Sequence, residues 1–466
     1  MRENVLLIGG GGREHAIARV LADSEVDLYA CAGNRNPGIA EIAAGFETLE
    51  TTDPDAVVEY AEAVDATIAV VGPEAPLEAG VADELEAAGV YAFGPKEADA
   101  RIETDKAFQR RFMAEHDIPG CPDFETFDDP EAACDFIDEY DGDLVIKPAG
   151  LTGGKGVKVI GEQVTPEEGK AYIRDSDYDR IVLEERLIGE EFTVQAFVAN
   201  ETFETAPAVQ DHKRAYEGDE GPNTGGMGSY SDATRELPFM TEEDYEESVS
   251  IIEATVDALE DYRGILYGQY MLTSEGPKVI EFNARFGDPE AMNTLPVLET
   301  EFLDVLTAAR DGDPVPELEF TNQATVCKYA VPEGYPTDPE AGAKVQVDEE
   351  SVARVVRAAD DSIGEGNDPR ESADDALLFY ASVEERNSSS SDDVDEREDG
   401  IYTTTSRSFA LVGVADTITD AEEIAERAIA VAGEEGLHVR HDIGKPDLVQ
   451  QRIDHVEELR GDDSND

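Results

Sequence analysis

The first hundred residues alternate between short apolar runs, glycine turns and helical patterns, and this alternation constrains the fold more than any other feature. Val5–Ile8 is apolar and runs into four consecutive glycines, Gly9–Gly12, after which a helical pattern continues from His15 to Ala22. Further apolar runs follow at 28–31, 67–71 and 90–93. Strands that alternate with helices build a parallel sheet covered on both faces. The sequence therefore predicts an N-terminal doubly wound parallel sheet domain.

Beyond about residue 102 the pattern changes to a mixed α/β and α+β arrangement. We predict helices at 104–115 and 242–262 and strands at 144–147, 157–160, 180–185, 192–198, 324–327 and 409–414. The expected domains are 1–102, 103–320 and 321–450, the last a small α/β domain, followed by an acidic tail at 451–466 that frays from Arg460. The segment 384–400 is rich in serine and acidic residues, and we expect it to be a mobile loop.

The composition narrows the possible partners. The formal net charge is -72, from 108 acidic and 36 basic residues, which excludes a general nucleic-acid binder because phosphate neutralisation needs basic surface. Acidic residues recur on every predicted helix, which favours a halophilic adaptation to a salty cytoplasm over an acidic surface for a partner. No apolar stretch reaches the roughly 18 residues that span a bilayer, so we expect a cytoplasmic protein with no membrane partner.

A predicted strand at Val279–Asn283 offers a candidate metal site. Side chains alternate along a strand, so Glu281 and Asn283 share one face, and Ile280 and Phe282 share the apolar face. A carboxylate and an amide oxygen are hard ligands suited to Mg²⁺. On its own, such a pair is usually just the solvent face of a strand.

A second strand at 267–273, followed by the turn 274–277, strengthens the metal hypothesis. A hairpin with a three-residue loop pairs Thr273 with Pro277 and places Gln269 opposite Glu281. Gln269 then becomes a third candidate ligand. A slip of one residue in this register would turn Gln269 to the other face.

Two glycine loops are candidates for phosphate binding. Between Lys147 and Val157, glycines surround Lys155, and backbone N–H and ammonium groups suit a triphosphate, although the pattern is not a Walker A motif. The alternative is a hairpin whose lysines face water. The loop Gly9–Gly12 fails the dinucleotide fingerprint because Glu14 stands where glycine or alanine is needed. It either binds a phosphorylated substrate at the helix N-terminus or is a purely structural turn.

Two further segments carry polar groups. Gln210–Arg214 is a basic cluster in an acidic chain, and Asn223–Gly228 follows closely, which together predict a substrate loop for carboxylate and phosphate groups. His212 is either catalytic or, as we favour, orienting or structural. Leu183–Glu191 could present backbone groups to adenine and a carboxylate to ribose, but acidic runs are frequent in this chain.

Several motifs, in one order along nearly the whole chain, resemble the phosphoribosylamine–glycine ligase family, which has an ATP-grasp fold. They lie at 11–16, 71–77, 93–95, 210–214, 221–228 and 279–290, with a weaker match at 442–444. The resemblance implies an ADP-forming carbon–nitrogen ligase of purine biosynthesis, with a central ATP-grasp domain. Its substrates would be glycine, 5-phosphoribosylamine and ATP, its metal Mg²⁺ or Mn²⁺, and its state a monomer or weak homo-oligomer.

The resemblance also implies roles for residues. Contacts to ATP are expected from Lys106, Lys147, Gly153, Gly154, Lys155, Gly156, Glu184, Glu185, Arg186, Leu187 and Glu191. Metal ligands are expected to be Glu281, Asn283 and Gln269. Glycine and phosphoribosylamine are expected at Gly10, Gly12, Arg13, Glu14, Asp211, Lys213, Arg214, Asn223, Thr224, Gly225, Gly226 and Asp288. The catalytic candidates Asp211, Lys213 and Arg285 should position groups and neutralise charge rather than act as nucleophiles.

The chain departs from the family's pattern at two places. Its ATP loop begins Lys147-Pro148-Ala149, where the family commonly has Lys-Ala-Asp, and a glycine-rich stretch of the C-terminal domain is replaced at 403–407. Two alternatives stay open at this point: another ATP-grasp carboxylate–amine ligase, and a non-catalytic nucleotide-binding regulator on the same fold. The paired Glu281 and Asn283 argue against a regulator.

Overall fold

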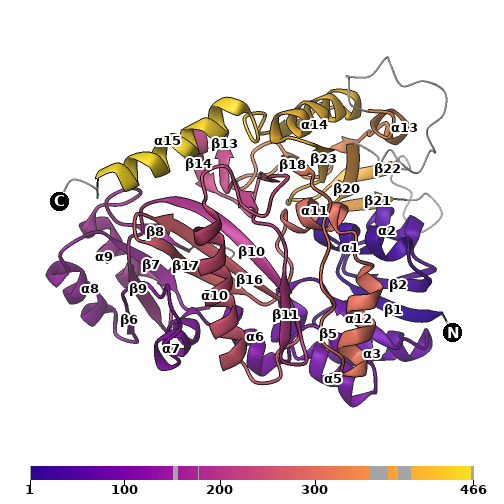
Figure 1. Cartoon of the computed structure of the whole chain (residues 1–466), viewed down its shortest axis with the longest axis horizontal. Coiled ribbons are helices and arrows are strands. Elements are labelled where there is room, and N and C mark those ends of the chain that lie inside the picture. Colours follow the sequence, from indigo (N-terminus) through magenta and orange to yellow (C-terminus); the bar gives the residue numbers. More distant parts are fainter. Residues whose placement is uncertain (1, 151–155, 177, 356–375, 387–399, 463–466) are drawn as a thin grey trace.

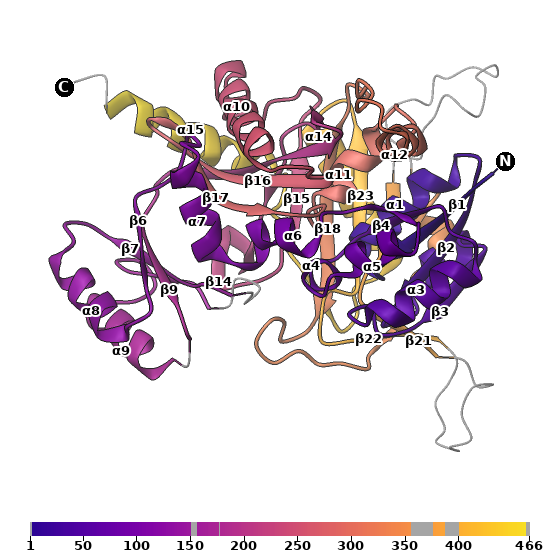
Figure 2. The same cartoon turned by 90° about the horizontal axis from the view of Figure 1, so that it is seen from below.

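The computed structural model describes residues 2–150, 156–176, 178–355, 376–386 and 400–462. Figure 1 shows the N-terminal segment, in indigo, beside the C-terminal strands, while the central segment extends to the opposite end of the molecule. In Figure 2, a small sheet with helices α8 and α9 stands apart as a lobe at that end. Among the described residues, no helix is both long and apolar enough to cross a membrane.

The N-terminal part confirms the predicted doubly wound sheet, with five parallel strands in the order β3-β2-β1-β4-β5. The strands are β1 (Glu3–Ile8), β2 (Val26–Ala32), β3 (Gly45–Thr48), β4 (Ile68–Val71) and β5 (Tyr91–Phe93). The helices are α1 (Gly12–Ala22), α2 (Pro37–Ile42), α3 (Pro54–Ala63), α4 (Glu74–Glu78), α5 (Val81–Ala87) and α6 (Glu97–Thr104). The strand order reverses between β1 and β4, so the turns after these strands form the crevice where such sheets bind ligands.

The central part contains two four-stranded sheets that face each other. The small lobe has the order β6-β9-β7-β8, with β6 (Phe124–Phe127), β7 (Leu144–Pro148), β8 (Lys158–Val159), β9 (Ile181–Glu185), α8 (Pro130–Glu139) and α9 (Pro166–Asp175). The second sheet has the order β11-β10-β16-β17, with β10 (Glu190–Ala199), β11 (Thr202–Thr205), β16 (Gly264–Thr273) and β17 (Gly276–Asn283). Helices α7 (Lys106–Glu115) and α10 (Glu242–Ala258) lie against this second sheet.

The C-terminal part is built on a sheet that also takes strands from the central segment. Its path is β12-β15-β18-β23-β20, with β24 paired to β18. The strands are β12 (Gln210–Asp211), β15 (Gly228–Ser231), β18 (Ala324–Pro332), β20 (Ala376–Tyr380), β23 (Phe409–Ala415) and β24 (Leu437–Val439). Because β12 and β15 flank the predicted substrate loop, this sheet anchors the loop at both ends.

The remaining elements are short connections, apart from two longer helices. Two small sheets contain β13 (Arg214–Tyr216) with β14 (Glu220–Asn223), and β19 (Lys344–Val345) with β22 (Gly400–Thr403) and β21 (Val383–Arg386). The helices are α11 (Ala291–Thr294), α12 (Phe302–Asp311), α13 (Glu349–Val352), α14 (Ile418–Ala432) and α15 (Pro446–Asp462), with 3-10 turns η1 (Glu217–Asp219) and η2 (Leu295–Val297).

Two expectations about the C-terminal region are the fraying of the tail from Arg460 and a mobile loop at 384–400. Helix α15 continues through Arg460 to Asp462, so the expected fraying from Arg460 is wrong for these residues, whose helix is tied down by an ion pair from Arg460 to Asp244. The predicted mobile acidic loop at 384–400 falls mainly on residues 387–399, which lie outside the described residues.

The β16–β17 hairpin confirms one half of the predicted register and corrects the other. Thr273 pairs with Gly276, not with Pro277, so the loop is one residue shorter than predicted. The register then shifts at a bulge between Gln269 and Tyr270, and Gln269 pairs with Glu281 as predicted. The extra residue, Ile280, is only partly buried, so the prediction that it packs on the apolar face with the buried Phe282 is wrong.

A buried contact joins the N-terminal helix α1 to the C-terminal strand β20. The backbone N–H of Tyr380 donates to His15 Nδ1 over 2.9 Å, and Asn36 Nδ2 donates to the carbonyls of Tyr380 and Gly10. Burial, with a smaller contribution from Arg19, lowers the pKa of His15 from 6.5 to about 3. The contact therefore requires a neutral imidazole.

This requirement predicts an acid-dependent loss of stability. The unfolded chain binds a proton at His15 below about pH 6.5 and the folded chain does not, so the stabilisation falls as the pH drops toward about 3. His15→Asn keeps an acceptor without titrating. We expect the difference in free energy of unfolding between the two proteins to shift by about 1.4 kcal/mol per pH unit between pH 6 and 4. Denaturant unfolding at several pH values measures this difference. If the free energies of unfolding of the two proteins changed equally with pH, His15 would not be the titrating group.

Candidate active site

Two cavities meet where the three parts of the chain come together. The central cavity, about 430 Å³, lies between the turns after β1 and β4, the end of β17 and the substrate loop. The inter-sheet cavity, about 240 Å³, lies between the two central sheets. Both are lined by Lys106, Lys213, Thr224 and Glu281. Ligands bound in the two cavities can therefore approach each other at this junction, beside Lys106, Lys213 and Glu281.

The inter-sheet cavity has apolar walls and a charged end. Its apolar side chains are Val145, Val157, Val159, Leu187, Met271 and Ile280. Its polar lining includes Lys147, Glu184, Glu185, Arg186, Glu191, Arg214 and Asn223. The bulge in β17 is the reason that Ile280 and Glu281 both line this space although they are neighbours in sequence. A slot with apolar walls leading to lysines suits a flat base followed by phosphates.

Glu184 organises the charged end of this cavity. Its carboxylate accepts hydrogen bonds from Lys147 Nζ at 2.6 Å and from Arg110 Nε and Nη2 at 2.8 and 3.0 Å. Burial opposes ionisation of Glu184, but the two cations outweigh it and lower its pKa to about 2. Burial also lowers the pKa of Lys147, which keeps a further hydrogen bond to the carbonyl of Ile280 at 3.0 Å. Glu184 thus holds Lys147 at the cavity wall.

Arg110, which supports Glu184 from behind the cavity wall, is a residue that the sequence interpretation missed. It lies on α7, four residues after Lys106, and is almost completely buried. Residues four apart share one face of a helix, so the spacing from Lys106 was an available signal. A buried arginine without a partner is costly, and the partner, Glu184, is 74 residues away in sequence.

Of the three predicted metal ligands, Glu281 lines both cavities, Gln269 lines the inter-sheet cavity and Asn283 lines the central one. Gln269 and Glu281 are paired across the hairpin, and Asn283 follows on the same strand. Gln269 Nε2 donates to Glu191 Oε2 at 2.7 Å, whereas its buried Oε1 has no hydrogen-bond partner among the described residues. Burial opposes ionisation of Glu281, but Lys106, Lys213 and Lys147 lower its pKa to about 2.

This set fits a magnesium-type ion. One carboxylate and two amide oxygens, one of them a buried oxygen without a partner, leave several positions for phosphates and water. The described residues contain no cluster of three or more His, Cys, Asp or Glu side chains that could hold a metal alone. An ion here would therefore depend on its substrate for ligands, as Mg²⁺ commonly does.

The central cavity brings buried charges of both signs together. Arg285 Nη2 pairs with Glu103 at 2.8 Å, and its Nε lies 3.6 Å from Glu74 without a hydrogen bond. Asp211 also lines this cavity, and its buried Oδ1 has no hydrogen-bond partner among the described residues. Burial and the nearby Glu290 raise the pKa of Asp211 well above its ordinary value. These groups can receive a small ligand that carries both an acid and an amine.

The N-terminal glycine loop contributes mainly Arg13 to this cavity. Glu14 turns back onto its own loop, where Oε2 accepts from the Gly11 N–H and Oε1 pairs with Arg13 Nε, both at 2.6 Å. Its carboxylate therefore occupies the helix N-terminus, which supports the structural-turn interpretation over a phosphate site there. Gly10, Gly12 and Glu14 do not line either cavity. Gly12 packs so closely that a Cβ would lie 2.4 Å from Tyr329 Oη.

The predicted residues of the substrate loop differ in which cavity they line. Lys213 and Thr224 line both cavities, Gly225 lines the central one, and Asn223 and Arg214 line the inter-sheet one. Gly226 lines neither. His212 is also absent from both walls. It is buried, and burial lowers its pKa to about 3, which supports an orienting or structural role.

The C-terminal part adds Arg407, a second residue that was missed. Its guanidinium donates to the carbonyls of Gly225 at 2.7 Å and Asp288 at 2.9 Å, pairs with the Asp288 carboxylate at 3.2 Å, and lies over the Tyr329 ring. A lone arginine in the segment 403–407 was the available signal. Tyr329 Oη also donates to Asp288 at 2.5 Å, so Asp288 is fixed between two groups.

The remaining predicted ATP contacts divide into two groups. Gly153, Gly154 and Lys155 lie outside the described residues. Gly156 is described, and its carbonyl accepts from Tyr172 Oη at 2.9 Å. Glu185 and Arg186 line the inter-sheet cavity, with Arg186 paired to Asp143 and Glu162.

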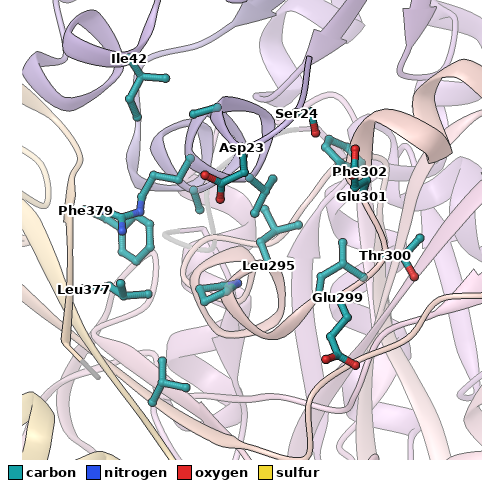
Figure 3. Close-up of a pocket in the computed structure, with 17 residues that line it drawn as sticks. Asp23, Ser24, Ile42, Leu295, Glu299, Thr300, Glu301, Phe302, Leu377 and Phe379 are labelled. Carbon is teal, nitrogen blue, oxygen red and sulfur yellow. The ribbon is translucent and has the colours of Figure 1, made fainter. Parts of the chain in front are cut away.

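A third cavity, about 580 Å³, lies away from these groups on the other side of α1. Figure 3 shows it enclosed by Leu295, Phe302, Leu377 and Phe379, with acidic side chains such as Glu299 near its edge. It shares no lining residue with the other two cavities and contains none of the predicted site residues. Its volume alone gives it no role in the chemistry.

Comparison with known proteins identifies three domains of one family along the chain. Family models of phosphoribosylglycinamide synthetase match in order: the N domain at 3–103, the ATP-grasp (A) domain at 104–291 and the C domain at 325–446. Phosphoribosylamine–glycine ligases of Methanocella arvoryzae and Methanosarcina barkeri are 48% and 49% identical, each over 98% of this chain and 100% of the relative.

A solved structure extends this similarity to three dimensions. The crystal structure of phosphoribosylamine–glycine ligase from Thermotoga maritima has a TM-score of 0.74 and 25% identity, covering 94% of this chain and 99% of that one. The family models together cover most of the chain, and the relatives align over nearly all of it. The chain therefore belongs to the phosphoribosylglycinamide synthetase family.

Proposed function

We propose that this protein is a phosphoribosylamine–glycine ligase, which joins glycine to 5-phosphoribosylamine at the expense of ATP. The products are glycinamide ribonucleotide, ADP and phosphate. The observation that carries this proposal is the meeting of the two cavities at Lys106, Lys213 and Glu281. It lets the terminal phosphate of a nucleotide in one cavity approach a small carboxylate in the other.

ATP fits the inter-sheet cavity. Its base would lie against the apolar walls near Leu187 and Met271, with its ribose toward Glu191. Lys147, held by Glu184, and Lys106 would contact the phosphates. The glycine loop at 153–156 is proposed to complete the phosphate contacts.

Glycine and phosphoribosylamine fit the central cavity. Arg285 and Arg13 supply positive charge for a carboxylate and a phosphate, while Asp211 and Glu290 supply oxygens for an amine. Lys213 and Asn223 are proposed to position the reacting groups. Mg²⁺ or Mn²⁺ would be held by Glu281, Asn283 and Gln269, and it would neutralise charge on the phosphates during transfer.

The reaction proceeds in two transfers. The glycine carboxylate takes the γ-phosphoryl group of ATP and releases ADP. The amine of phosphoribosylamine then attacks the glycyl carbonyl carbon and phosphate leaves, with the proton of the amine lost. The protein's part is positioning and charge neutralisation, which is what phosphoryl transfer mainly requires.

Several broader properties belong to the same proposal. We propose domains at 1–102, 103–320 and 321–450, a cytoplasmic location, and a monomer or weak homo-oligomer that does not bind nucleic acid. The net charge of -72 supports adaptation to high salt, since screening relieves the repulsion between the acidic groups.

The first prediction of this proposal concerns substrate dependence. In about 2 M KCl with Mg²⁺, we expect ADP release when glycine and freshly made phosphoribosylamine are both present. Glycine alone should give only background release because the glycyl phosphate has no amine acceptor, and phosphoribosylamine alone because no carboxylate is present to take the phosphoryl group. ADP is measured by a coupled assay. ATP binding without any ADP release, at any salt concentration, would favour the regulator.

The second prediction concerns Glu281. Glu281→Gln keeps the size of the side chain but removes the only carboxylate of the proposed metal set, so we expect kcat to fall by about 100-fold or more. The Mg²⁺ concentration for half-maximal activity should rise. Glu275→Gln, at the exposed turn of the same hairpin, is the control and should leave both values unchanged. Equal Mg²⁺ dependence in wild type and Glu281→Gln would remove Glu281 from the metal set.

A further inference from the structure

The β13–β14 hairpin is held both at its start and at its tip by residues from the C-terminal region. This hairpin connects Lys213 to Thr224, the two loop residues that line both cavities. His438 Nε2 lies 2.8 Å from the carbonyl oxygen of Ala215, and Arg440 Nη1 donates to the carbonyl of Arg214 at 3.1 Å. Helix α15, in yellow in Figure 1, contacts the turn between β13 and β14 through Arg452 and Asp219.

Asp219, at the tip of the hairpin, is the centre of these contacts. Its carboxylate pairs with Arg440 at 2.9 Å and with Arg452 of α15. Burial opposes its ionisation, but the cations around it lower its pKa. The backbone of Asp219 has a φ of 56°, the left-handed conformation that Asp adopts more readily than most residues in tight turns. Asp442 Oδ2 accepts from the neighbouring Gly218 N–H at 2.9 Å.

Arg452 also connects the hairpin to the strand that borders the inter-sheet cavity. Its Nε lies 3.4 Å from Glu190 Oε2, at the start of β10. Glu190 is buried and accepts from Gln210 Nε2 at 3.3 Å, and Gln210 Nε2 also donates to the carbonyl of Glu191 at 3.1 Å. One arginine thus bridges the tip of the substrate hairpin and the strand beside the proposed ribose contact.

Arg452 lies outside the residues that the family models match, whereas its partners Asp219 and Glu190 lie within the match to the ATP-grasp domain. The C-domain match ends at residue 446, whereas α15 runs from Pro446 to Asp462. Arg452 touches neither cavity, so its influence on the reaction must pass through Asp219 and Glu190.

We propose that Arg452 is a positioning residue, through which α15 fixes the β13–β14 hairpin and so keeps Lys213 and Thr224 at the junction of the cavities. This inference rests on the proposed ligase function. Arg452 bridges two carboxylates that belong to different strands, and a shorter or neutral side chain cannot hold both. Displacement of the hairpin by a fraction of an ångström would misplace Lys213 relative to both substrates.

The test compares Arg452→Met, which keeps an apolar stem of similar length, with Arg452→Lys, which keeps the charge. Asp219→Asn removes the partner. Arg427→Met on α14 is the control, because among the described residues Arg427 donates only to a carbonyl of its own helix, that of Glu423. Each protein is assayed for kcat, for KM of all three substrates and for Tm, and amide hydrogen exchange is measured without substrates.

We expect Arg452→Met and Asp219→Asn each to lower kcat by about 10-fold or more and to speed exchange of the amides at 214–223. Arg452→Lys should recover part of kcat, and the double variant should be no worse than either single one. Amide exchange in β1 to β5 should keep the wild-type rate in every variant. Arg427→Met should keep the wild-type kcat, KM, Tm and exchange rates.

The exchange measurement keeps this inference separate from the proposed function. If the wild type releases no ADP, the ligase assignment fails, while faster exchange at 214–223 in Arg452→Met still shows that Arg452 holds the hairpin. Unchanged exchange there, or exchange that rises equally throughout the chain, would overturn the inference. Faster exchange with an unchanged kcat in an active enzyme would also overturn it.

Discussion

The buried carboxylate of Glu184 is the interaction on which the nucleotide site depends. It accepts three hydrogen bonds from Lys147 and Arg110, and all three side chains are buried. Two buried cations without this partner would be costly, and Lys147 would have no fixed position at the cavity wall. In a chain with 108 acidic residues and 36 basic ones, this geometry concentrates scarce positive charge where phosphates are expected.

A second constraint is the bulge in β17. It changes the register between Gln269 and Tyr270, which sets Gln269 against Glu281 and turns Ile280 toward the inter-sheet cavity. Because of this one extra residue, the adjacent Ile280 and Glu281 both line the cavity. Ile280 is an apolar wall for a base, and Glu281 is a carboxylate near the expected phosphates. A regular hairpin would give one or the other, because neighbouring side chains point to opposite faces.

The central cavity exists because three separate parts of the chain are held together by buried polar contacts. His15 and Asn36 tie the N-terminal sheet to β20, and Arg407 ties the C-terminal part to the carbonyls of Gly225 and Asp288. The contacts of Asp219 add a further connection at the outer end of the substrate hairpin. Each contact links residues that are more than a hundred positions apart.

The sequence by itself determined the elements with a strong local signal. The apolar runs that form β1, β2, β4 and β5 were identifiable because strands buried on both faces are continuously apolar. The short β3 and helix α2 were not. The motifs also identified the family and most residues of the two cavities, since Lys106, Lys147, Lys213, Glu281 and Arg285 stand in characteristic local patterns.

Only the tertiary structure decided which of these residues meet and which partners hold them. The local signals at Arg110 and Arg407 do not show what these residues contact, because their partners Glu184 and Asp288 lie 74 and 119 residues away. The bulge in β17 follows from packing rather than from turn composition, so a register counted from the loop was wrong at Thr273 and right at Gln269. Local sequence encodes periodicity and turns, whereas burial and charge pairing depend on segments that only folding brings together.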